Sequence, residues 1–337
     1  MNNIATNQNK LLSIALPTYN RQDFLDFYFK THVPRFSKYN IAIYISDNCS
    51  IDNTLDVIKK WQAIYPFIYV KSLVENVHFD KNVESALNFA NSEYIWLMGD
   101  SYELPESSLD KMLDILSSNE ENYNVIIANL VNSIQNIDEK IYTNANNAFI
   151  DLCWMVGCIS CNIYHKSMLI EADYGQYSQT EFCHVGFVYD YIAKHNFKLY
   201  WAQSVPVVTL KTPVRKSGWG QYFLSITFEK WPALIRRLPL CYSDKEKAEV
   251  IRSLSEKGKI LHWRAILNVR AQGFLNKETR ALYKHEFDNI APKYFRYFSY
   301  CLLFIPPSVC KFILLQVEWL RRKNYKIRHM INPKKII

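Results

Sequence analysis

The chain has 337 residues, of which 49% are hydrophobic, so it can form one large domain or two smaller ones around a substantial core. With only 8 glycines and 12 prolines, and no repeat of solenoid length, it is neither collagen-like nor of low complexity. The net charge of +8 is concentrated in residues 293–337, which carry ten Lys or Arg and one acid. These basic residues are interleaved with Phe, Leu, Ile and Trp, which favours an anionic lipid surface as the partner and argues against nucleic acid.

The amino-terminal residues MNNIATNQNK are polar and lack the apolar segment of a secretory signal, so a cytoplasmic chain with reduced thiols is expected. The eight cysteines include one CxxC motif, at 158–161, without a second pair. We interpret it as part of a buried strand, with a zinc site as the weaker alternative. The longest apolar run, 297–317, contains Pro306, Pro307 and Lys311, which interrupt any helix that would span a membrane. It predicts two helices lying on the membrane surface or, alternatively, a hairpin packed on the body.

Short apolar runs and amphipathic stretches alternate along the first two-thirds of the chain, after a tail, residues 1–10, that we expect to be disordered. Strands are predicted at 12–16, 41–46, 68–72, 94–98, 124–129, 159–164, 198–201 and 205–209. Helices are predicted at 23–38, 52–65, 80–90, 109–117 and 182–195. Helix-sized connections between strands indicate an α/β fold with a mostly parallel sheet. From about residue 222 the pattern is helical.

Three predicted strands run directly into polar turns. The segments are LLSIALPTYNR at 11–21, IAIYISDNCSIDNT at 41–54 and YIWLMGD at 94–100. The carboxyl ends of parallel strands meet at one edge of a sheet, where open α/β sheets bind their ligands. The sequence therefore predicts one nucleotide-sized site formed by these three turns.

The order of these motifs resembles that of the family 2 glycosyltransferases, and within them the bacterial enzymes that build O-antigen and capsule sugars. The resemblance is close over residues 11–110 and loose over 150–225. It implies a GT-A fold in residues 11–222, with the donor half at 11–120 and the acceptor half at 121–222. Residues 223–337 would form a helical region with a basic, membrane-facing tail. The implied reaction is inverting transfer from a nucleotide-diphosphate sugar to a glycan acceptor, which we expect to be lipid-linked, at the inner face of the cell membrane.

The resemblance also implies donor contacts. Asp47 would accept a hydrogen bond from the base, and Asn76 and Asn82 match a family stretch, Asn-x-Gly-x-x-x-Asn, in which His78 replaces the glycine. His78 could contact ribose or phosphate, or could be an exposed loop residue that hinders close backbone approach. Asn48, like Ser50, Asp52 and Thr54, is as readily explained as a turn or cap former. The residues expected to line the nucleotide after the first strand are Pro17, Thr18, Tyr19, Asn20 and Arg21.

The turn Gly99-Asp100-Ser101-Tyr102-Glu103 stands where the family has an Asp-x-Asp motif that holds Mg²⁺ or Mn²⁺ against the diphosphate. Only Asp100 is retained, with Ser101 beside it and Glu103 one place too far along. Asp100 and Glu103 could bind a divalent cation through a shifted turn, or the protein could supply the positive charge, or the site could be inactive. The side chains available for the second alternative, a loop over the diphosphate or acceptor, are Lys211, Arg215 and Lys216, with Trp219.

Inverting transfer needs a general base for the acceptor hydroxyl, which the family supplies from a Glu-Asp pair. The matching region here lacks that pair, and we assign His184 as the first choice, Glu181 as the second or as its orienting partner, and Asp190 as the third. The missing acids also motivate a competing hypothesis, a non-catalytic binding or scaffold protein. A nucleotidyltransferase is less favoured because no Gly-rich basic loop follows the first strand.

Overall fold

The computed structural model describes residues 8–118, 122–131, 133–212 and 220–331, with side chains described as far as Leu320. The chain divides into two compact units. The first unit comprises residues 1–215 and 233–250, and the second comprises residues 216–232 and 251–337.

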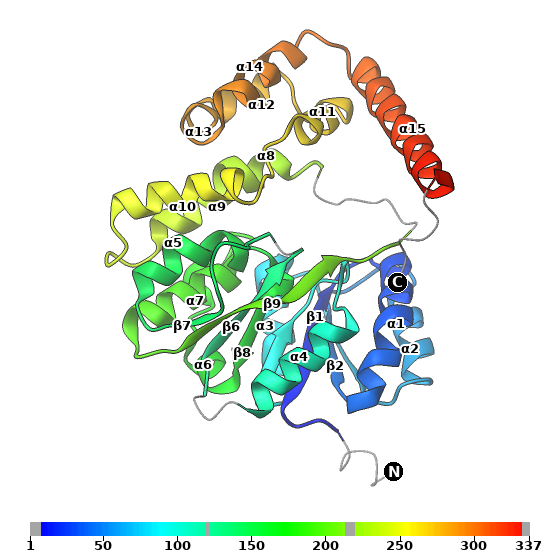
Figure 1. The fold of residues 1–337 in the computed structure, drawn as a ribbon, viewed down its shortest axis with the longest axis vertical. Helices are drawn as coiled ribbons and strands as arrows, with labels where there is room; N and C mark the ends of the chain where they lie inside the picture. The colour runs from blue at the N-terminus through cyan, green and yellow to red at the C-terminus, as the bar shows by residue number, and fades with distance from the viewer. Residues whose placement is uncertain (1–7, 119–121, 132, 213–219, 332–337) are drawn as a thin grey trace. The chain divides into compact units, whose positions relative to one another are not determined.

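The first unit is built on a sheet with the strand order β3-β2-β1-β4-β8-β6-β9-β5, and β7 pairs with β9 (Figure 1). The pairs β3–β2, β2–β1, β1–β4 and β6–β9 are parallel. Strand β8 runs antiparallel between β4 and β6, and β5 and β7 are antiparallel to β9. The prediction of a mostly parallel α/β sheet is therefore confirmed. The bounds are β1 (Leu12–Thr18), β2 (Ala42–Asp47), β3 (Ile68–Ser72), β4 (Tyr94–Leu97), β5 (Tyr102–Glu103), β6 (Val125–Leu130), β7 (Lys140–Tyr142), β8 (Asn162–His165) and β9 (Leu199–Thr209).

Right-handed crossovers determine where the helices lie. Strand order moves one way from β1 to β3 and then returns to β4, so α3 covers the face opposite α1 and α2. Helices α1 and α2 pack together through the rings of Phe29 and Trp61, 5.8 Å apart, and Trp61 Nε1 donates to Asp26 at 2.9 Å. The bounds are α1 (Gln22–Phe36), α2 (Thr54–Gln62), α3 (His78–Phe89), α4 (Glu106–Ser117), α5 (Ala145–Val156), α6 (Lys166–Glu171) and α7 (Cys183–Lys194), with short turns η2 (Ser37–Tyr39), η3 (Ile159–Cys161) and η4 (Gly175–Tyr177).

The central strands β1, β2 and β4 are almost completely buried, as expected for strands covered on both faces. Trp96 of β4 and Trp201 of β9 are fully buried, and both indole N–H groups are satisfied. Trp96 Nε1 donates to Ser160 O at 2.9 Å and Trp201 Nε1 to Ile137 O at 3.0 Å. The sheet therefore holds the strand ends in fixed positions relative to one another.

Several local predictions were wrong. Residues 8–10 are ordered rather than disordered: Asn9 Oδ1 accepts from the backbone N–H groups of Leu11 and Leu12, both at 2.9 Å, while residues 1–7 lie outside the described part. The CxxC segment forms the η3 turn rather than a strand, with Cys161 N donating to Cys158 O at 3.0 Å. The predicted strands at 198–201 and 205–209 are one continuous strand, β9.

The boundary predicted at 222/223 is also corrected, because residues 233–250 belong to the first unit. Tyr242 is buried there, with its ring 4.3 Å from that of Phe149 of α5 and its hydroxyl donating to Tyr189 O of α7 at 2.8 Å. The helical pattern of this segment gave no sign of which body it packs on. Helices α9 (Trp231–Arg237) and α10 (Asp244–Glu256) contain the points where the chain passes between units.

The second unit is helical. Phe287 lies at its centre, stacked 4.1 Å from the Phe228 ring and 6.1 Å from the Phe295 ring. Arg270 Nε and Nη2 both donate to Ile305 O, at 3.0 and 2.9 Å, which fixes the break that Pro306 and Pro307 impose. The bounds are α8 (Phe223–Ser225), the π-helical η5 (Ile226–Lys230), α11 (Trp263–Ala271), α12 (Lys277–Leu282), α13 (Lys284–Ile290), α14 (Lys293–Leu302) and α15 (Pro307–Ile331).

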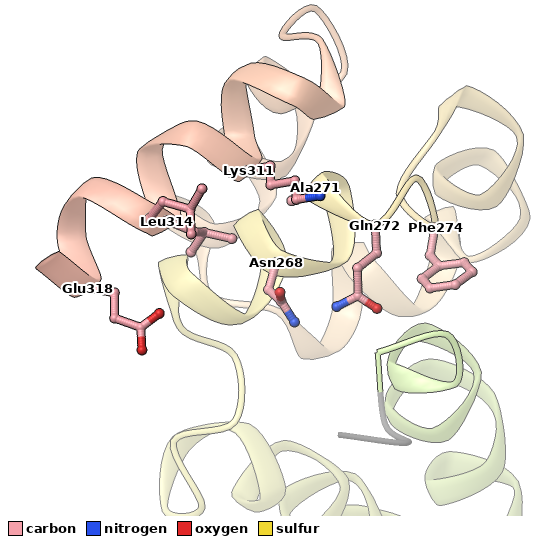
Figure 2. Close-up of a pocket in the computed structure, with 8 residues that line it drawn as sticks. Asn268, Ala271, Gln272, Phe274, Lys311, Leu314 and Glu318 are labelled. Carbon is pink, nitrogen blue, oxygen red and sulfur yellow. The ribbon is translucent and has the colours of Figure 1, made fainter. Parts of the chain in front are cut away.

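A hollow of about 500 Å³ lies between α11 and α15 in this unit. Figure 2 shows Lys311, Leu314 and Glu318 on α15, Asn268 on α11 and Gln272 just after α11 around it. Its lining mixes polar and aliphatic side chains, and it includes none of the residues predicted for the nucleotide site. Within the described ranges, no helix combines the length and the apolar character that crossing a bilayer requires.

Candidate active site

The ends of β1 and β2 and the start of α3 bring four predicted donor residues together. Thr18 and Asp47 are partners in the parallel register of β1 and β2. The carbonyl of Thr18 accepts from the backbone N–H of Asn48 at 2.9 Å and from Asn82 Nδ2 at 3.2 Å. Thr18, Asp47, Asn48 and Asn82 therefore form one buried cluster at the edge of the sheet, as the sequence predicted.

Three side-chain atoms of this cluster lack hydrogen-bond partners. Thr18 Oγ1, Asp47 Oδ1 and Asn82 Oδ1 are all buried, and none has a partner among the described residues. The second carboxylate oxygen of Asp47 accepts from the backbone N–H of Ser50 at 3.2 Å, so the carboxylate is oriented by one oxygen only. Buried polar atoms are normally paired, and three exceptions at one strand end are what a site for a polar ligand would leave.

The loops after β1 and β2 lock each other in place. Asn20 N donates to Ser50 Oγ at 2.8 Å and Asn20 Oδ1 accepts from Ile51 N at 2.9 Å, while Arg21 N donates to Thr54 Oγ1 at 2.8 Å. Ser50 and Thr54 thus use their hydroxyl groups to bridge the two loops. Pro17 is the penultimate residue of β1, and Tyr19 beyond it is 40% exposed and presents a ring to solvent.

The loop before α3 is organised by Asn48. Its Nδ2 donates to Asn76 Oδ1 at 3.0 Å, and its Oδ1 accepts from Val77 N at 2.8 Å. His78 has a φ of 66°, the left-handed conformation that glycine adopts most easily. The backbone geometry of a glycine is therefore kept although the side chain has changed. Left-handed non-glycine residues also follow β1 and β2, at Asn20 and Cys49, and such strain gathers at ligand sites.

Asp100 forms a bidentate ion pair with Arg21. Arg21 Nε donates to Asp100 Oδ2 and Nη2 to Oδ1, both at 2.7 Å. The guanidinium also lies over the Phe24 ring, 3.7 Å from its centroid. The Asp100 side chain is 9% exposed and that of Arg21 23%, so the pair is largely shielded from water. Both oxygens of Asp100 are consequently occupied by the protein's own cation.

The second acid of the turn is directed elsewhere. Glu103 Oε1 accepts from Arg35 Nη2 at 2.9 Å, and Arg35 Nη1 also donates to the carbonyl of Leu104. Ser101 is half-buried, and its carbonyl accepts from Leu210 N at 2.9 Å. Across the described ranges no group of three or more His, Cys, Asp or Glu is placed to hold a metal ion. With Asp100 and Glu103 each paired to an arginine, these residues as arranged do not fit a divalent cation.

One of the predicted loop cations is placed beside this turn. Lys211 is exposed, and the backbone N–H of the residue before it, Leu210, donates to the carbonyl of Ser101. Thr209, at the end of β9, pairs with Tyr102 of β5. The remaining predicted residues of that loop, Arg215, Lys216 and Trp219, lie outside the described residues.

His184 lies in the interior at the start of α7. It is 1% exposed, its Nε2 is 3.3 Å from Gly157 O, and its Nδ1 has no partner in the described chain. Burial lowers the pKa of His184 to about 4, so the imidazole is neutral at pH 7 and a poor proton acceptor. Its buried position argues against the role of acceptor base. Glu181, by contrast, is half-buried just ahead of α7.

Asp190 has a structural role. Its Oδ1 accepts from the Tyr177 hydroxyl at 3.0 Å and its Oδ2 from Lys194 Nζ at 2.6 Å. The side chain is 7% exposed, and both oxygens are occupied. The third choice for the base is therefore not supported by the geometry.

One residue that sequence reasoning missed connects the two halves of the site. Asp80, in the first turn of α3, accepts from Glu181 N at 2.9 Å and from Cys183 N at 3.1 Å. It therefore caps the amino terminus of α7 from a different helix. No local pattern indicates this contact, since an Asp in a first helical turn is common for local reasons.

Comparisons with known proteins agree with this geometry. Residues 13–173 match the family model described as glycosyl transferase family 2. Abequosyltransferase RfbV of Salmonella typhimurium is 29% identical over 181 residues, covering 48% of this chain and 53% of its own length. The putative teichuronic acid biosynthesis glycosyltransferase TuaG of Bacillus subtilis is 26% identical over 111 residues, covering 33% of this chain and 44% of its own. The chain thus spans about half the length, or less, of the curated relatives it matches.

Two solved structures share the fold. The TarS 1–349 structure of S. aureus superposes with a TM-score of 0.50 and 14% identity, covering 87% of this chain and 88% of that one. The mannosyltransferase PcManGT of Pyrobaculum calidifontis, in complex with GDP-Man and Mn²⁺, gives a TM-score of 0.51 and 11% identity, covering 88% of each chain. The predicted GT-A architecture, an α/β sheet followed by carboxyl-terminal helices, is therefore confirmed. Through its residues 13–173, just under half of its length, the chain is similar to glycosyltransferase family 2.

Proposed function

We propose that this chain is a glycosyltransferase that moves a sugar from a nucleotide-diphosphate sugar to a glycan acceptor during synthesis of a surface polysaccharide of the O-antigen or capsule type. The family 2 domain supports sugar transfer. The names of the two relatives, one an abequosyltransferase and the other a teichuronic acid enzyme, support a glycan acceptor of this kind.

The observation that carries the proposal is the set of three unpaired buried atoms, Thr18 Oγ1, Asp47 Oδ1 and Asn82 Oδ1. Each unpaired buried polar atom costs about 1–3 kcal/mol, which a ligand that supplies the missing partner recovers. The free oxygen of Asp47 accepts a base N–H, and the Thr18 hydroxyl and Asn82 amide complete the polar contacts. The exposed ring of Tyr19, just beyond β1, supplies a stacking surface.

The test is a calorimetric titration with UDP, GDP, CDP and dTDP, and with their nucleosides, on the wild type and on Asp47→Asn. We expect one base to be preferred, and Asp47→Asn to weaken it by about tenfold through loss of the carboxylate acceptor. Asp56→Asn is the matched control, because Asp56 is exposed on α2 in a surface pair with Lys59. Binding that is equal in Asp47→Asn and the wild type would refute the placement of the base.

The acceptor step follows from the position of Glu181. We propose that its carboxylate takes the proton of the acceptor hydroxyl while that oxygen bonds to the anomeric carbon and the bond from this carbon to the diphosphate breaks. The nucleoside diphosphate leaves, and the single displacement inverts configuration. His184 is enclosed and neutral, so it orients the α7 terminus rather than taking the proton.

We further propose that residues 293–337 hold the chain at the cytoplasmic face of a membrane, near a lipid-linked acceptor. Tyr297 on α14 is 74% exposed and Phe304, just after α14, is 67% exposed. On α15, Phe312 is 60% exposed and follows the exposed Lys311. Exposed aromatic residues together with a lysine suit the interface of an anionic bilayer.

Vesicle sedimentation tests the membrane proposal. We expect phosphatidylglycerol vesicles to bind the chain and phosphatidylcholine vesicles to bind it weakly, with the double variant Tyr297→Ser, Phe304→Ser losing most of the binding. Leu240→Ser is the control, since Leu240 is 96% exposed but belongs to the first unit. Equal binding by the double variant would refute the assignment of this surface.

One observation favours a second candidate, the non-catalytic binding protein. The only retained acid of the Asp-x-Asp position, Asp100, is engaged by Arg21 rather than left open. A nucleotide-binding scaffold predicts tight nucleotide binding without turnover of any nucleotide sugar. Transfer activity in the wild type excludes it.

A further inference from the structure

The ion pair of Arg21 and Asp100 occupies the place where the family's metal would bind. Two hydrogen bonds of 2.7 Å, both charge-assisted, hold the carboxylate, and the pair is largely shielded from water. A divalent ion that used Asp100 would have to break both bonds and leave the guanidinium beside a second cation. The pairing therefore opposes metal binding at this carboxylate.

Arg21 is held from three sides. Its backbone N–H donates to Thr54 Oγ1 at 2.8 Å, its guanidinium lies 3.7 Å from the centroid of the Phe24 ring, and Asp100 binds its Nε and Nη2. The two bonds to Asp100 use two of the five N–H donors of the guanidinium. Three donors remain without a protein partner in the described part of the chain, on a side chain that is 23% exposed. A fork of this kind matches phosphate oxygens.

A second cation stands beside the same turn. Lys211 is exposed, and the chain just before it is tied to the turn by the bond from Leu210 N to Ser101 O at 2.9 Å. Arg21 and Asp100 together are neutral, so Lys211 adds a positive charge beside this turn, which favours an anion there.

Building on the proposed function, we propose that Arg21, positioned by Asp100 and assisted by Lys211, binds the diphosphate of the donor in place of a metal ion, so that donor binding needs no divalent cation. Asp100 is then a positioning residue for the arginine. The same cations would stabilise the negative charge that develops on the leaving diphosphate.

The first test needs no variant. The wild type is titrated with UDP, GDP, CDP and dTDP in EDTA, in Mg²⁺ and in Mn²⁺, and with the corresponding nucleosides. We expect the preferred nucleoside diphosphate to bind about tenfold or more tightly than its nucleoside, with a Kd that changes by less than about threefold between EDTA and either metal.

The second test separates Arg21 from the remainder of the site. Arg21→Ala is expected to lose most of the tenfold advantage of the diphosphate while nucleoside affinity stays within about threefold of the wild type. Arg21→Lys keeps the charge but not the fork, so it should also lose most of the advantage and serves as a second variant should Arg21→Ala fail to fold. Arg237→Ala is the control, because Arg237 is exposed on α9 in the first unit.

The outcomes distinguish this inference from the proposed function. If Mg²⁺ or Mn²⁺ tightens diphosphate binding more than about threefold, or if Arg21→Ala and Arg21→Lys keep the diphosphate advantage, the inference is overturned and the nucleotide site stands. If the folded wild type binds neither nucleoside nor diphosphate under any condition, the inference and the proposed function are both wrong.

Discussion

The carboxylate of Asp80 accepts a hydrogen bond from the backbone N–H of Glu181 at 2.9 Å, across 101 residues of chain. Its other oxygen binds Cys183 N at 3.1 Å, so one side chain of α3 caps α7. Asn82, two residues further along α3, contacts the end of β1. Asp80 therefore fixes the segment that holds Glu181 relative to the strand ends that form the nucleotide cluster.

Removing this cap should destabilise the first unit. Asp80→Ala deletes two charge-assisted bonds to a buried helix terminus, so we expect the free energy of unfolding to fall by about 2–4 kcal/mol in urea denaturation. Asp80→Asn keeps one acceptor oxygen, so its free energy of unfolding should fall by less than that of Asp80→Ala. Asp56→Ala, on an exposed surface pair, is the control and should stay within about 0.5 kcal/mol. An Asp80→Ala protein as stable as the wild type would contradict the capping role.

The φ of 66° at His78 makes a second prediction. Any residue with a Cβ is strained in this conformation, whereas glycine is not. We expect His78→Gly to be more stable than His78→Ala by about 1 kcal/mol, measured by urea unfolding. Nucleoside binding by His78→Gly should match or exceed that of the wild type, since the backbone path is unchanged. Equal stability of the two variants would show that the loop relaxes.

Two conservative variants test which residue is the general base for the acceptor hydroxyl. We expect Glu181→Gln to lower kcat by about a hundredfold or more, because an amide cannot take the acceptor proton. His184→Asn retains a donor for Gly157 O and should lower kcat by less than about tenfold. Circular dichroism confirms that both variants are folded. The opposite ranking would restore His184 as the base and require that α7 opens.

Two buried histidines predict how stability depends on pH. Burial lowers the pKa of His184 to about 4 and that of His32 to about 3, each from an ordinary value near 6.5. Because the unfolded chain binds these protons first, their contribution is fully present above pH 6.5 and falls as the pH drops toward 4.

Each histidine should remove roughly 1 kcal/mol of stability per pH unit in that interval. Urea unfolding at pH 7, 6, 5 and 4.5 measures the slope. In His184→Asn, the free energy of unfolding should fall less steeply with decreasing pH than in the wild type, because one of the two buried histidines is absent. A slope that is unchanged in this variant would mean that His184 is protonated equally in the folded and unfolded chains.

The strand ends could be predicted from the sequence because they depend on local patterns. Apolar runs that stop at Pro17 and Asp47 specify where two buried strands end, and parallel pairing then places those ends together. The break at Pro306 and Pro307 could be predicted in the same way, since each proline removes a backbone hydrogen-bond donor and two in succession interrupt a helix. In each of these cases, residues close together in the chain determine the outcome.

The features that were missed depend on pairing between distant segments. Arg21 and Asp100 are 79 residues apart, and no local sequence pattern predicts that they form an ion pair. Helix α5 was not predicted because it is buried on most sides and lacks an amphipathic stripe. The burial of His184 depends in part on the ring of Phe79, which packs against it from α3.

Sugar transfer itself tests the account most directly. The wild type and Asp47→Asn would be incubated with radiolabelled sugars linked to UDP, GDP, CDP or dTDP and with an organic extract of lipid-linked bacterial glycans, and label in the glycan fraction would be measured. We expect transfer from donors of the base preferred in the titrations, reduced about tenfold or more in Asp47→Asn. Tight nucleotide binding with no transfer from any donor would contradict it and leave the scaffold as the better description.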